Sequence, residues 1–270
     1  SCPPEKDNIN MTCLTNPPGS SNAFIAKPNN IGKFAAQFFA SRNAAVSTAL
    51  DGAIAEKIVK LEQADEKLAG KGAAVATPTA PAGGALAKTG SVVIAAGSDS
   101  DMPHLENLAA ELAKFKIPSQ IRICSAHKQP ARLQALIQSL NASGEPVLMV
   151  GCAGGTDALS GTASYLAKFP VVSCPPEKDD INMTCLKNPP GSSNAFIAKP
   201  NNIGKFAAQF FASRNAAVST ALDGAIAEKI VKLEQADEKL AGKGAAVATP
   251  TAPAGGALAK TGSVVIAAGS

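Results

Sequence analysis

Three short polar loops carry residue types that could bind a phosphorylated ligand and move a proton. The first, residues 97–101, reads GSDSD. The hydroxyls of Ser98 and Ser100 and the N–H groups of a helix start suit a phosphate, and the Asp101 carboxylate suits sugar hydroxyls. Because serine and aspartate are also ordinary helix N-caps, capping alone is the alternative interpretation of this loop.

The second loop, residues 125–130, reads SAHKQP and offers acid–base chemistry. An imidazole exchanges a proton near neutral pH, and Lys128 beside His127 can neutralise an anion, with Ser125 as a further hydroxyl. A lone histidine is more often structural, and of the two in the chain we expect His104, in an early helix among polar residues, on the surface. The position of His127 after a strand favours a functional role.

The third loop, residues 151–161, reads GCAGGTDALSG. Its Gly154 and Gly155 allow the backbone to approach a ligand closely. Glycine-rich loops are common, so this loop alone is weak evidence. The more specific signal is the ordered set of three polar loops, each of which follows a predicted strand.

The elements that must position these loops alternate between short apolar strands and helices. We expect strands at residues 91–96, 120–124, 146–150, 170–172 and 195–198, and helices at residues 105–115, 131–140 and 158–166. This alternation predicts an α/β fold, a doubly wound three-layer sandwich around a parallel sheet. In such sheets ligands bind beyond the carboxyl ends of the strands, so the three loops should converge there.

A long C-terminal helical stretch, residues 203–240, follows the last predicted strand. Its apolar stripe of Leu222, Ile226, Ile230 and Leu233 is too long to fold back entirely on one small domain. We therefore expect this apolar face to pack on a neighbour. The alternative for the first half of the stretch is that it closes the core of its own domain.

The chain also contains a long internal repeat, because residues 1–98 recur as residues 173–270. The two positions that differ are Asn8, which becomes Asp180, and Thr15, which becomes Lys187. A period of 172 residues fits one ordinary domain plus a connector. The repeat therefore suggests a window cut from a longer polyprotein.

The repeat fixes the expected domain boundaries. We expect the C-terminal half of a preceding unit at 1–68, an Ala/Gly/Pro tether at 69–90, a complete domain at 91–240, a second tether at 241–262 and the first strand of a next repeat at 263–270. The tether composition cannot bury a core and is typical of a semi-flexible linker. We expect residues 1–68 to pack as the end of a preceding unit.

Charge, hydropathy and cysteine usage bear on whether the protein binds nucleic acid, spans a membrane or holds disulfides. The net charge of +4 is small and lysines are scattered among acids, which disfavours a nucleic-acid partner. No apolar run approaches the ~20 residues that span a membrane. Of the six cysteines, Cys2 and Cys13 are repeat copies of Cys174 and Cys185, so four are distinct, and none lies in a CxxC pair. This favours buried thiols in a reducing compartment such as the cytoplasm over metal ligands or disulfides.

The ordered motifs resemble the PurE family of purine biosynthesis, the carboxylases of aminoimidazole ribonucleotide (AIR) and their mutase siblings. The resemblance covers residues 91–240 and includes GSDSDM, SAHK, the ALSG turn, VVSCPP, NPPGSSNAFIAKP and FAAQFFA. It implies a flavodoxin-like fold of the PurE type. Lys128, ALSG and SCPP are similar to class II members, which use carbon dioxide directly, whereas class I members rearrange the N5-carboxylated isomer.

The resemblance implies reversible carboxylation of AIR at C4, with AIR and CO2 as partners and with neither metal nor other cofactor. It implies that Ser98, Ser100 and Asp101 bind the ribose phosphate, and that His127 moves the C4 proton. The remaining substrate-binding residues that it implies are Ser125, Lys128, Gly154, Gly155 and Lys187. Family members form octamers with sites at subunit contacts, which predicts a homo-oligomer of tethered repeats.

Two features depart from the family pattern. Gly155 stands where class II members carry arginine, and Asp157 puts a carboxylate where an amide would sit. We expect the lost charge to cost on the order of 1 kcal/mol in binding an anionic substrate. Lys187 keeps a family cation that Thr15 has lost. The second hypothesis is therefore a catalytically weak or inactive structural protein that uses the octamer to build a filament, cage or lattice.

Overall fold

The structure is a computed structural model, and it describes residues 19–25, 28–69, 86–176 and 182–241. Within these residues a five-stranded sheet has the order β2-β1-β3-β4-β5, and each neighbouring pair of strands is parallel. The strands are β1 (Ser91–Ala96), β2 (Ser119–Ile123), β3 (Val147–Cys152), β4 (Val171–Ser173) and β5 (Ala195–Phe196). This is the flavodoxin-like order, so the predicted fold class is confirmed.

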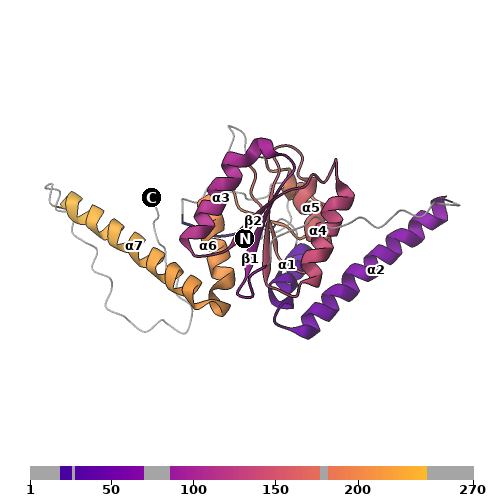
Figure 1. Cartoon of the computed structure of the whole chain (residues 1–270), viewed down its shortest axis with the longest axis horizontal. Helices are drawn as coiled ribbons and strands as arrows, with labels where there is room; N and C mark the ends of the chain where they lie inside the picture. Colours follow the sequence, from indigo (N-terminus) through magenta and orange to yellow (C-terminus); the bar gives the residue numbers. More distant parts are fainter. Residues whose placement is uncertain (1–18, 26–27, 70–85, 177–181, 242–270) are drawn as a thin grey trace, which may run out of the picture. The chain divides into compact units, whose positions relative to one another are not determined.

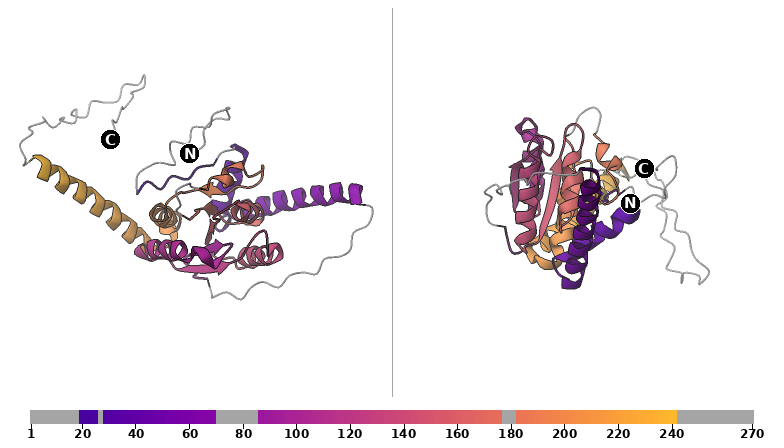
Figure 2. Two further views of the ribbon diagram at one scale, coloured as in Figure 1. Left: turned by 90° about the horizontal axis from the view of Figure 1, so that it is seen from above. Right: turned by 90° about the vertical axis from the view of Figure 1, so that its right-hand side faces the viewer.

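Helices cover both faces of the sheet (Figures 1 and 2). Strand β1 is buried along its whole length, and successive side chains point to opposite faces. Val92 and Ile94 pack in the cluster that contains α3 (Met102–Lys114) and α6 (Pro200–Phe211). Val93 packs in the cluster on the other face, which contains α4 (Pro130–Ala142) and α5 (Ala158–Leu166). The three layers therefore follow from strands that are apolar on both sides.

The helical stretch predicted at residues 203–240 is present, and it consists of two helices with a short break between them. Helix α6 gives way to a short 3-10 turn, Ala212–Arg214, and Asn215 has an extended backbone with φ −138° and ψ 100°. The Asn215 side-chain oxygen accepts from Val218 N at 3.3 Å and so caps the next helix, α7 (Ala216–Ala241). Asparagine, a strong N-cap, is the physical reason for the break.

The chain divides into two units between Gly224 and Ala225, inside α7. In the first unit the start of α7 closes the core, because Val218 is fully buried and Leu222 packs beside it. The first half of the stretch 203–240, which is α6 and the start of α7, thus follows the alternative named above. In the second unit the exposed large apolar residues are Ile226, Ile230, Val231 and Leu233. No helix among the described residues is long and apolar enough to cross a membrane.

We call residues 19–25 and 28–69 the first-copy segment; it contains two helices, α1 (Pro28–Ala40) and α2 (Ala44–Ala69). Phe24 joins this segment to β5 through an antiparallel bridge with Phe196, and Phe34 lies in the same core cluster as α3 and α6. Of the tether predicted at 69–90, residues 70–85 lie outside the described residues, as do residues 242–262 of the second tether and the strand predicted at 263–270. Leu86, near the end of the first predicted tether, packs against a core cluster.

Candidate functional site

The three loops meet at one cavity of about 380 Å³ beyond the carboxyl ends of β1, β2 and β3. Its lining residues are Gly97, Ser98, Ser100, Asp101, Ser125, Ala126, His127, Ala153, Gly154, Gly155, Thr156 and Leu159. Seven of the nine predicted site residues are in this set, whereas Lys128 and Lys187 are outside it. The parallel register explains the convergence, because it brings the ends of adjacent strands to the same edge.

The first loop combines a cap with an open carboxylate. Ser98 has an extended backbone, and its Oγ accepts from Ser100 N at 3.1 Å to cap the short 3-10 helix Asp99–Asp101. Asp101 is the N-cap residue of α3 but makes no side-chain cap hydrogen bond. Capping therefore accounts for the Ser98 oxygen as an acceptor. It does not account for the Asp101 carboxylate, which lines the cavity.

The second loop is a tight turn held by Ser125. Its Oγ accepts from Lys128 N at 3.2 Å, and its carbonyl accepts from Gln129 N at 2.8 Å. The His127 side chain is exposed at the cavity. A Cβ placed on Gly97 would lie 3.9 Å from Ser125 Oγ, so the first two loops are neighbours. The turn directs His127 into the cavity and leaves Lys128 exposed beside it.

The third loop is held from outside by a residue that sequence analysis missed. Asn182 donates from its amide nitrogen to the carbonyls of Ala153, at 2.8 Å, and Gly155. Its side-chain oxygen accepts from Thr184 N at 3.0 Å. Asn182 comes from the segment after β4, far along the chain from the loop, and no motif spacing in the sequence marks it. It is a positioning residue for the backbone that lines the cavity.

Asp157 does not face the cavity, which corrects the expectation that its carboxylate would repel an anionic substrate. It is 4% exposed and caps α5, where its carboxylate accepts from Ser160 N at 2.9 Å and from the Ser160 hydroxyl. The Ser160 hydroxyl also lies 2.6 Å from Ser173 Oγ, which accepts from Asn194. The carboxylate is thus part of a buried polar network behind the loop.

Replacing Asp157 should therefore affect stability more than substrate affinity. We expect Asp157→Ala to lower the free energy of unfolding by about 2–3 kcal/mol, because the helix loses its cap and the buried Ser160 hydroxyl loses a partner. Urea denaturation measures this. The exposed Asp99→Ala is the matched control and should stay within about 0.5 kcal/mol. A variant with unchanged stability but a lower KM would restore the repulsion hypothesis.

Two other predicted positions lie away from the cavity lining. Lys187 is exposed in the last turn of the 3-10 helix Thr184–Lys187. His104 is half-buried rather than on the surface, and its Nε2 lies 3.1 Å from the Cys174 carbonyl oxygen. The sequence could not place His104 because its partner, Cys174, directly follows β4 and is 70 residues further along the chain. In the part of the chain described, no three His, Cys, Asp or Glu side chains gather to hold a metal ion.

The four cysteines among the described residues are free thiols and buried: Cys124, Cys152, Cys174 and Cys185. Burial raises the pKa of the Cys152 thiol well above its usual range, and the nearby Cys174 and Asp157 add to this shift. Burial also raises the pKa of Cys185 to about 12, with the Asp157 carboxylate as the second cause. These thiols stay protonated where an exposed thiol would ionise, so they are poor nucleophiles and poor metal ligands.

The raised pKa of Cys185 predicts an alkaline loss of stability. Folding holds the proton that the unfolded chain releases near pH 9.0, so the contribution is complete below pH 9 and is lost between pH 9 and about pH 12. The free energy of unfolding should fall by about 1.4 kcal/mol per pH unit for this thiol. Cys185→Ala should show a shallower fall between pH 9 and 11 in urea titrations, with parallel curves at pH 6–8. Equal alkaline slopes would refute this.

Comparison with known proteins follows the same boundaries. The family model described as AIR carboxylase matches residues 91–231. Phosphoribosylaminoimidazole carboxylase of Treponema denticola is 32% identical over 153 residues, which are 55% of this chain and 96% of that protein. The crystal structure of Treponema denticola PurE superposes with a TM-score of 0.53 at 32% identity, and the match covers 56% of this chain and 98% of that one.

A longer relative matches over the same region. The human bifunctional phosphoribosylaminoimidazole carboxylase/phosphoribosylaminoimidazole succinocarboxamide synthetase is 32% identical over 153 residues. These residues are 55% of this chain but 36% of that protein. The chain therefore spans about a third of the length of the bifunctional relative, and the likeness concerns one of its parts.

Proposed function

The chain belongs to the AIR carboxylase family, and from this premise we propose that it carboxylates AIR at C4 with carbon dioxide, a step of purine biosynthesis. The observation that carries the proposal is the convergence of Ser98, Ser100, Asp101, Ser125 and His127 on one cavity. Hydroxyl, carboxylate and imidazole groups there match a ribose phosphate and a carbon acid. The relatives' names support the same chemistry.

The substrate phosphate is placed at the first loop in this proposal. Ser98 and Ser100 offer hydroxyls, and the loop leads directly into α3, whose N-terminal N–H groups favour an anion. The Asp101 carboxylate is suited to accept hydrogen bonds from ribose hydroxyls because it makes no capping hydrogen bond to the start of α3. Exposed Lys128, one residue beyond His127, contributes positive charge near the cavity without lining it. Lys187 lies in a separate turn, so we do not assign it a direct contact.

His127 is proposed to transfer the C4 proton. Attack of C4 on carbon dioxide forms a carbon–carbon bond and leaves C4 with both a hydrogen and a carboxylate. His127 then accepts that proton, the C4–H electron pair restores the aromatic ring, and the proton passes to water. Its exposed imidazole at the cavity suits this exchange, which needs one positioned acid–base group.

The test is turnover by the full chain. AIR is incubated with bicarbonate and dissolved carbon dioxide, and the carboxylated product is followed by absorbance. A parallel assay supplies the N5-carboxylated isomer instead, so that carboxylase and mutase activities are separated. Product formation from AIR and carbon dioxide supports the proposal, product from the isomer alone assigns a mutase, and no product from either by a correctly folded chain overturns it.

A second candidate function, a tethered structural assembly, is favoured by one observation. The described first-copy segment packs on the complete domain through hydrogen bonds such as Lys33 Nζ to Gly191 O at 3.0 Å. In this alternative the domains associate as a homo-octamer in a reducing compartment such as the cytoplasm, and the tethers link octamers into a filament, cage or lattice. Linked arrays in electron micrographs of a chain without turnover would favour it over the enzyme.

A further inference from the structure

Two copies of one sequence segment face each other in the structure. Residues 19–42 recur at an offset of 172 residues. Phe24 and Phe196 are equivalent positions, and they pair through two backbone hydrogen bonds of 3.1 and 3.0 Å. The rings of Phe38 and Phe210, also equivalent, have centroids 4.7 Å apart in an edge-to-face arrangement. Each of these residues therefore contacts its own counterpart.

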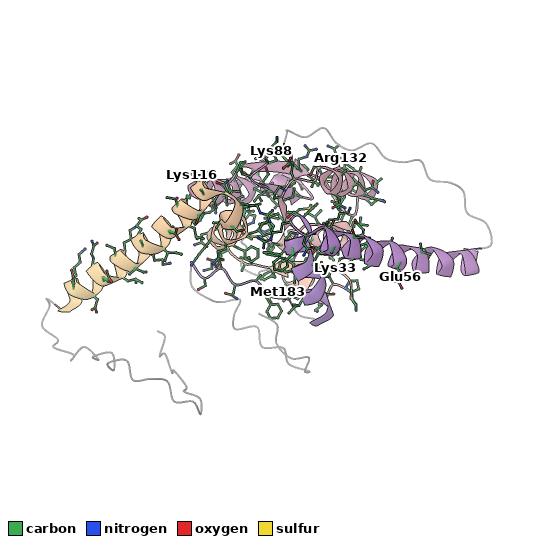
Figure 3. All side chains as sticks on the ribbon, turned by 90° about the horizontal axis from the view of Figure 1, so that it is seen from below. Lys33, Glu56, Lys88, Lys116, Arg132 and Met183 are labelled. Carbon is green, nitrogen blue, oxygen red and sulfur yellow. The ribbon has the colours of Figure 1, made fainter. Side chains whose placement is uncertain are left out.

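The side-chain hydrogen bonds across this contact come in reciprocal pairs. Lys33, labelled in Figure 3, donates from Nζ to Gly191 O at 3.0 Å, and Lys205 Nζ donates to Gly19 O at 2.9 Å. The other reciprocal pairs are Gly19–Asn202 with Gly191–Asn30, Ser21–Gln209 with Ser193–Gln37, and Arg42–Ser213 with Arg214–Ser41. Such reciprocity defines an isologous contact about a local two-fold axis.

The same residues differ in burial between the two copies. In α6 the residues Ile203, Ala207 and Phe211 are all 0% exposed. Their counterparts in α1 are Ile31, which is 36% exposed, Ala35, which is exposed, and Phe39, which is 48% exposed. We call Ile31, Ala35 and Phe39 the open face of α1. The same side chains are buried in the second copy, whereas in the first copy they are exposed, with the Arg42 guanidinium 5.0 Å from the centre of the Phe39 ring.

The second copy shows what covers this face. Helix α3 packs on α6 so closely that a Cβ on Gly204 would lie 2.8 Å from the Glu111 carbonyl oxygen, and Leu105 and Leu108 of α3 are fully buried in the same cluster. The equivalent Gly32 in α1 has nothing within 4 Å of such a Cβ. The partner of α6 belongs to residues 99–172, which occur once in this chain.

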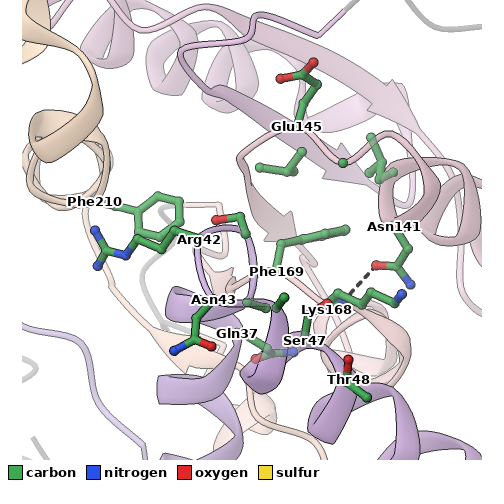
Figure 4. A pocket seen from close by; sticks show the side chains of 16 residues that line it. Gln37, Arg42, Asn43, Ser47, Thr48, Asn141, Glu145, Lys168, Phe169 and Phe210 are labelled. Atoms are coloured by element: carbon green, nitrogen blue, oxygen red, sulfur yellow. Dashed lines mark hydrogen bonds between the residues drawn. The ribbon is translucent and has the colours of Figure 1, made fainter.

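Gln37 and Gln209 supply independent evidence on the opposite side of the segment. Gln37 is 1% exposed and donates to the carbonyls of Ser164, at 3.1 Å, and Ala167, at 2.8 Å, both in or next to α5. It lines a cavity of about 400 Å³. Figure 4 shows Gln37 and Phe169 among the side chains that line this cavity. Gln209, its counterpart, is exposed. Under the local two-fold axis, Gln209 lacks the α5 carbonyls of a second domain.

We propose that the first-copy segment is the C-terminal half of a second α/β domain, and that the open face of α1 is the docking surface for a further copy of residues 91–172. That copy would lay its own α3 on Ile31, Ala35 and Phe39. By the two-fold axis it would bring its own α5 to Gln209. Two complete domains would then form an isologous pair within tethered repeats, with Phe24 and Phe196 on the axis.

Thiol labelling tests the docking surface directly. Ala35→Cys and Ala207→Cys are matched variants, and each substitution marks its own peptide in two otherwise identical stretches. In the 270-residue chain the thiol at position 35 should react fast and that at position 207 slowly. When a further copy of residues 91–172 is joined before Ser1, labelling at position 35 should slow by at least about 100-fold, to the rate at position 207.

Control chains give the test its outcomes. In the first control, the copy of residues 91–172 joined before Ser1 carries aspartate at the positions equivalent to Leu105 and Leu112, and the thiol at position 35 should stay reactive. In the second, that added copy is unchanged and the chain carries Phe39→Glu, and the thiol at position 35 should again stay reactive. The exposed Gln134→Glu on α4 should keep the protection. Unchanged labelling at position 35 in the intact extension overturns the proposal. Protection that grows with concentration in the 270-residue chain also overturns it, because the open face would then pair with itself.

Discussion

His127→Asn is expected to lower kcat for AIR carboxylation by about 10²- to 10⁴-fold, the range that a positioned acid–base group contributes. Asparagine keeps a polar side chain of similar size at the cavity but cannot accept the C4 proton. Because His127 is exposed and lies in a loop, the fold should be unaffected. Steady-state kinetics with AIR and carbon dioxide, at saturating AIR, measures the effect on kcat separately from KM.

His104→Asn is the matched control, since the chain has two histidines. Its Nε2 lies against the Cys174 carbonyl, away from the cavity lining. We expect a small loss of stability and kcat within about twofold of the parent, because no reacting group is removed. A His127→Asn chain that keeps its kcat, or a His104→Asn chain that loses it while folded, would show that the proton-transfer group has been assigned wrongly.

Phe211→Ala should lower the free energy of unfolding by about 3–5 kcal/mol, whereas Phe39→Ala should change it by less than about 1 kcal/mol. Phe211 is fully buried, and its ring lies so close to Gly90 that a Cβ there would clash at 2.3 Å. Phe39 is 48% exposed. The two phenylalanines have the same neighbours in sequence, so helix propensity and unfolded-state effects are matched between them.

Urea denaturation of both variants, followed by far-UV circular dichroism, measures this contrast. The expected result is a large fall in midpoint for Phe211→Ala and almost none for Phe39→Ala. Equal losses would mean that α1 is covered in solution by something within the 270-residue chain, and the open face would not exist. Equal small effects would mean instead that α6 is not part of the core.

Most of the fold was predictable because four of the five strands, all except β2, are buried. Strands such as β1 and β3 are continuous apolar runs, and the loops after them hold glycine and polar residues. The break before α7 coincides with the polar run Ser213-Arg214-Asn215, in which Asn215 is the cap, but a short polar run also fits the exposed side of a continuous helix. The position of a break within a helical stretch is therefore harder to predict than the first and last residues of the stretch.

The convergence of the three loops was also predictable, but the direction of single side chains was not. Asp157 is in the third loop, and its sequence position fits a ligand contact as well as a cap. Its rotamer is decided by Ser160, Ser173 and Asn194, which come together only in the folded chain. Asn182 went unpredicted for the same reason. Phe39 and Phe211 are the extreme case, because identical sequence gives different burial.

The self-pairing of Phe24 with Phe196 has an evolutionary consequence. Where a contact joins a residue to its own copy, a mutation present in both copies changes both sides of the interface at once, whereas a mutation in one copy faces the unchanged residue of the other. Selection on such a contact acts on matched pairs and disfavours divergence between copies. Lys187, which differs from Thr15, is exposed and outside the reciprocal contacts. Sequence differences between the two copies should therefore concentrate at residues that do not contact their own counterpart.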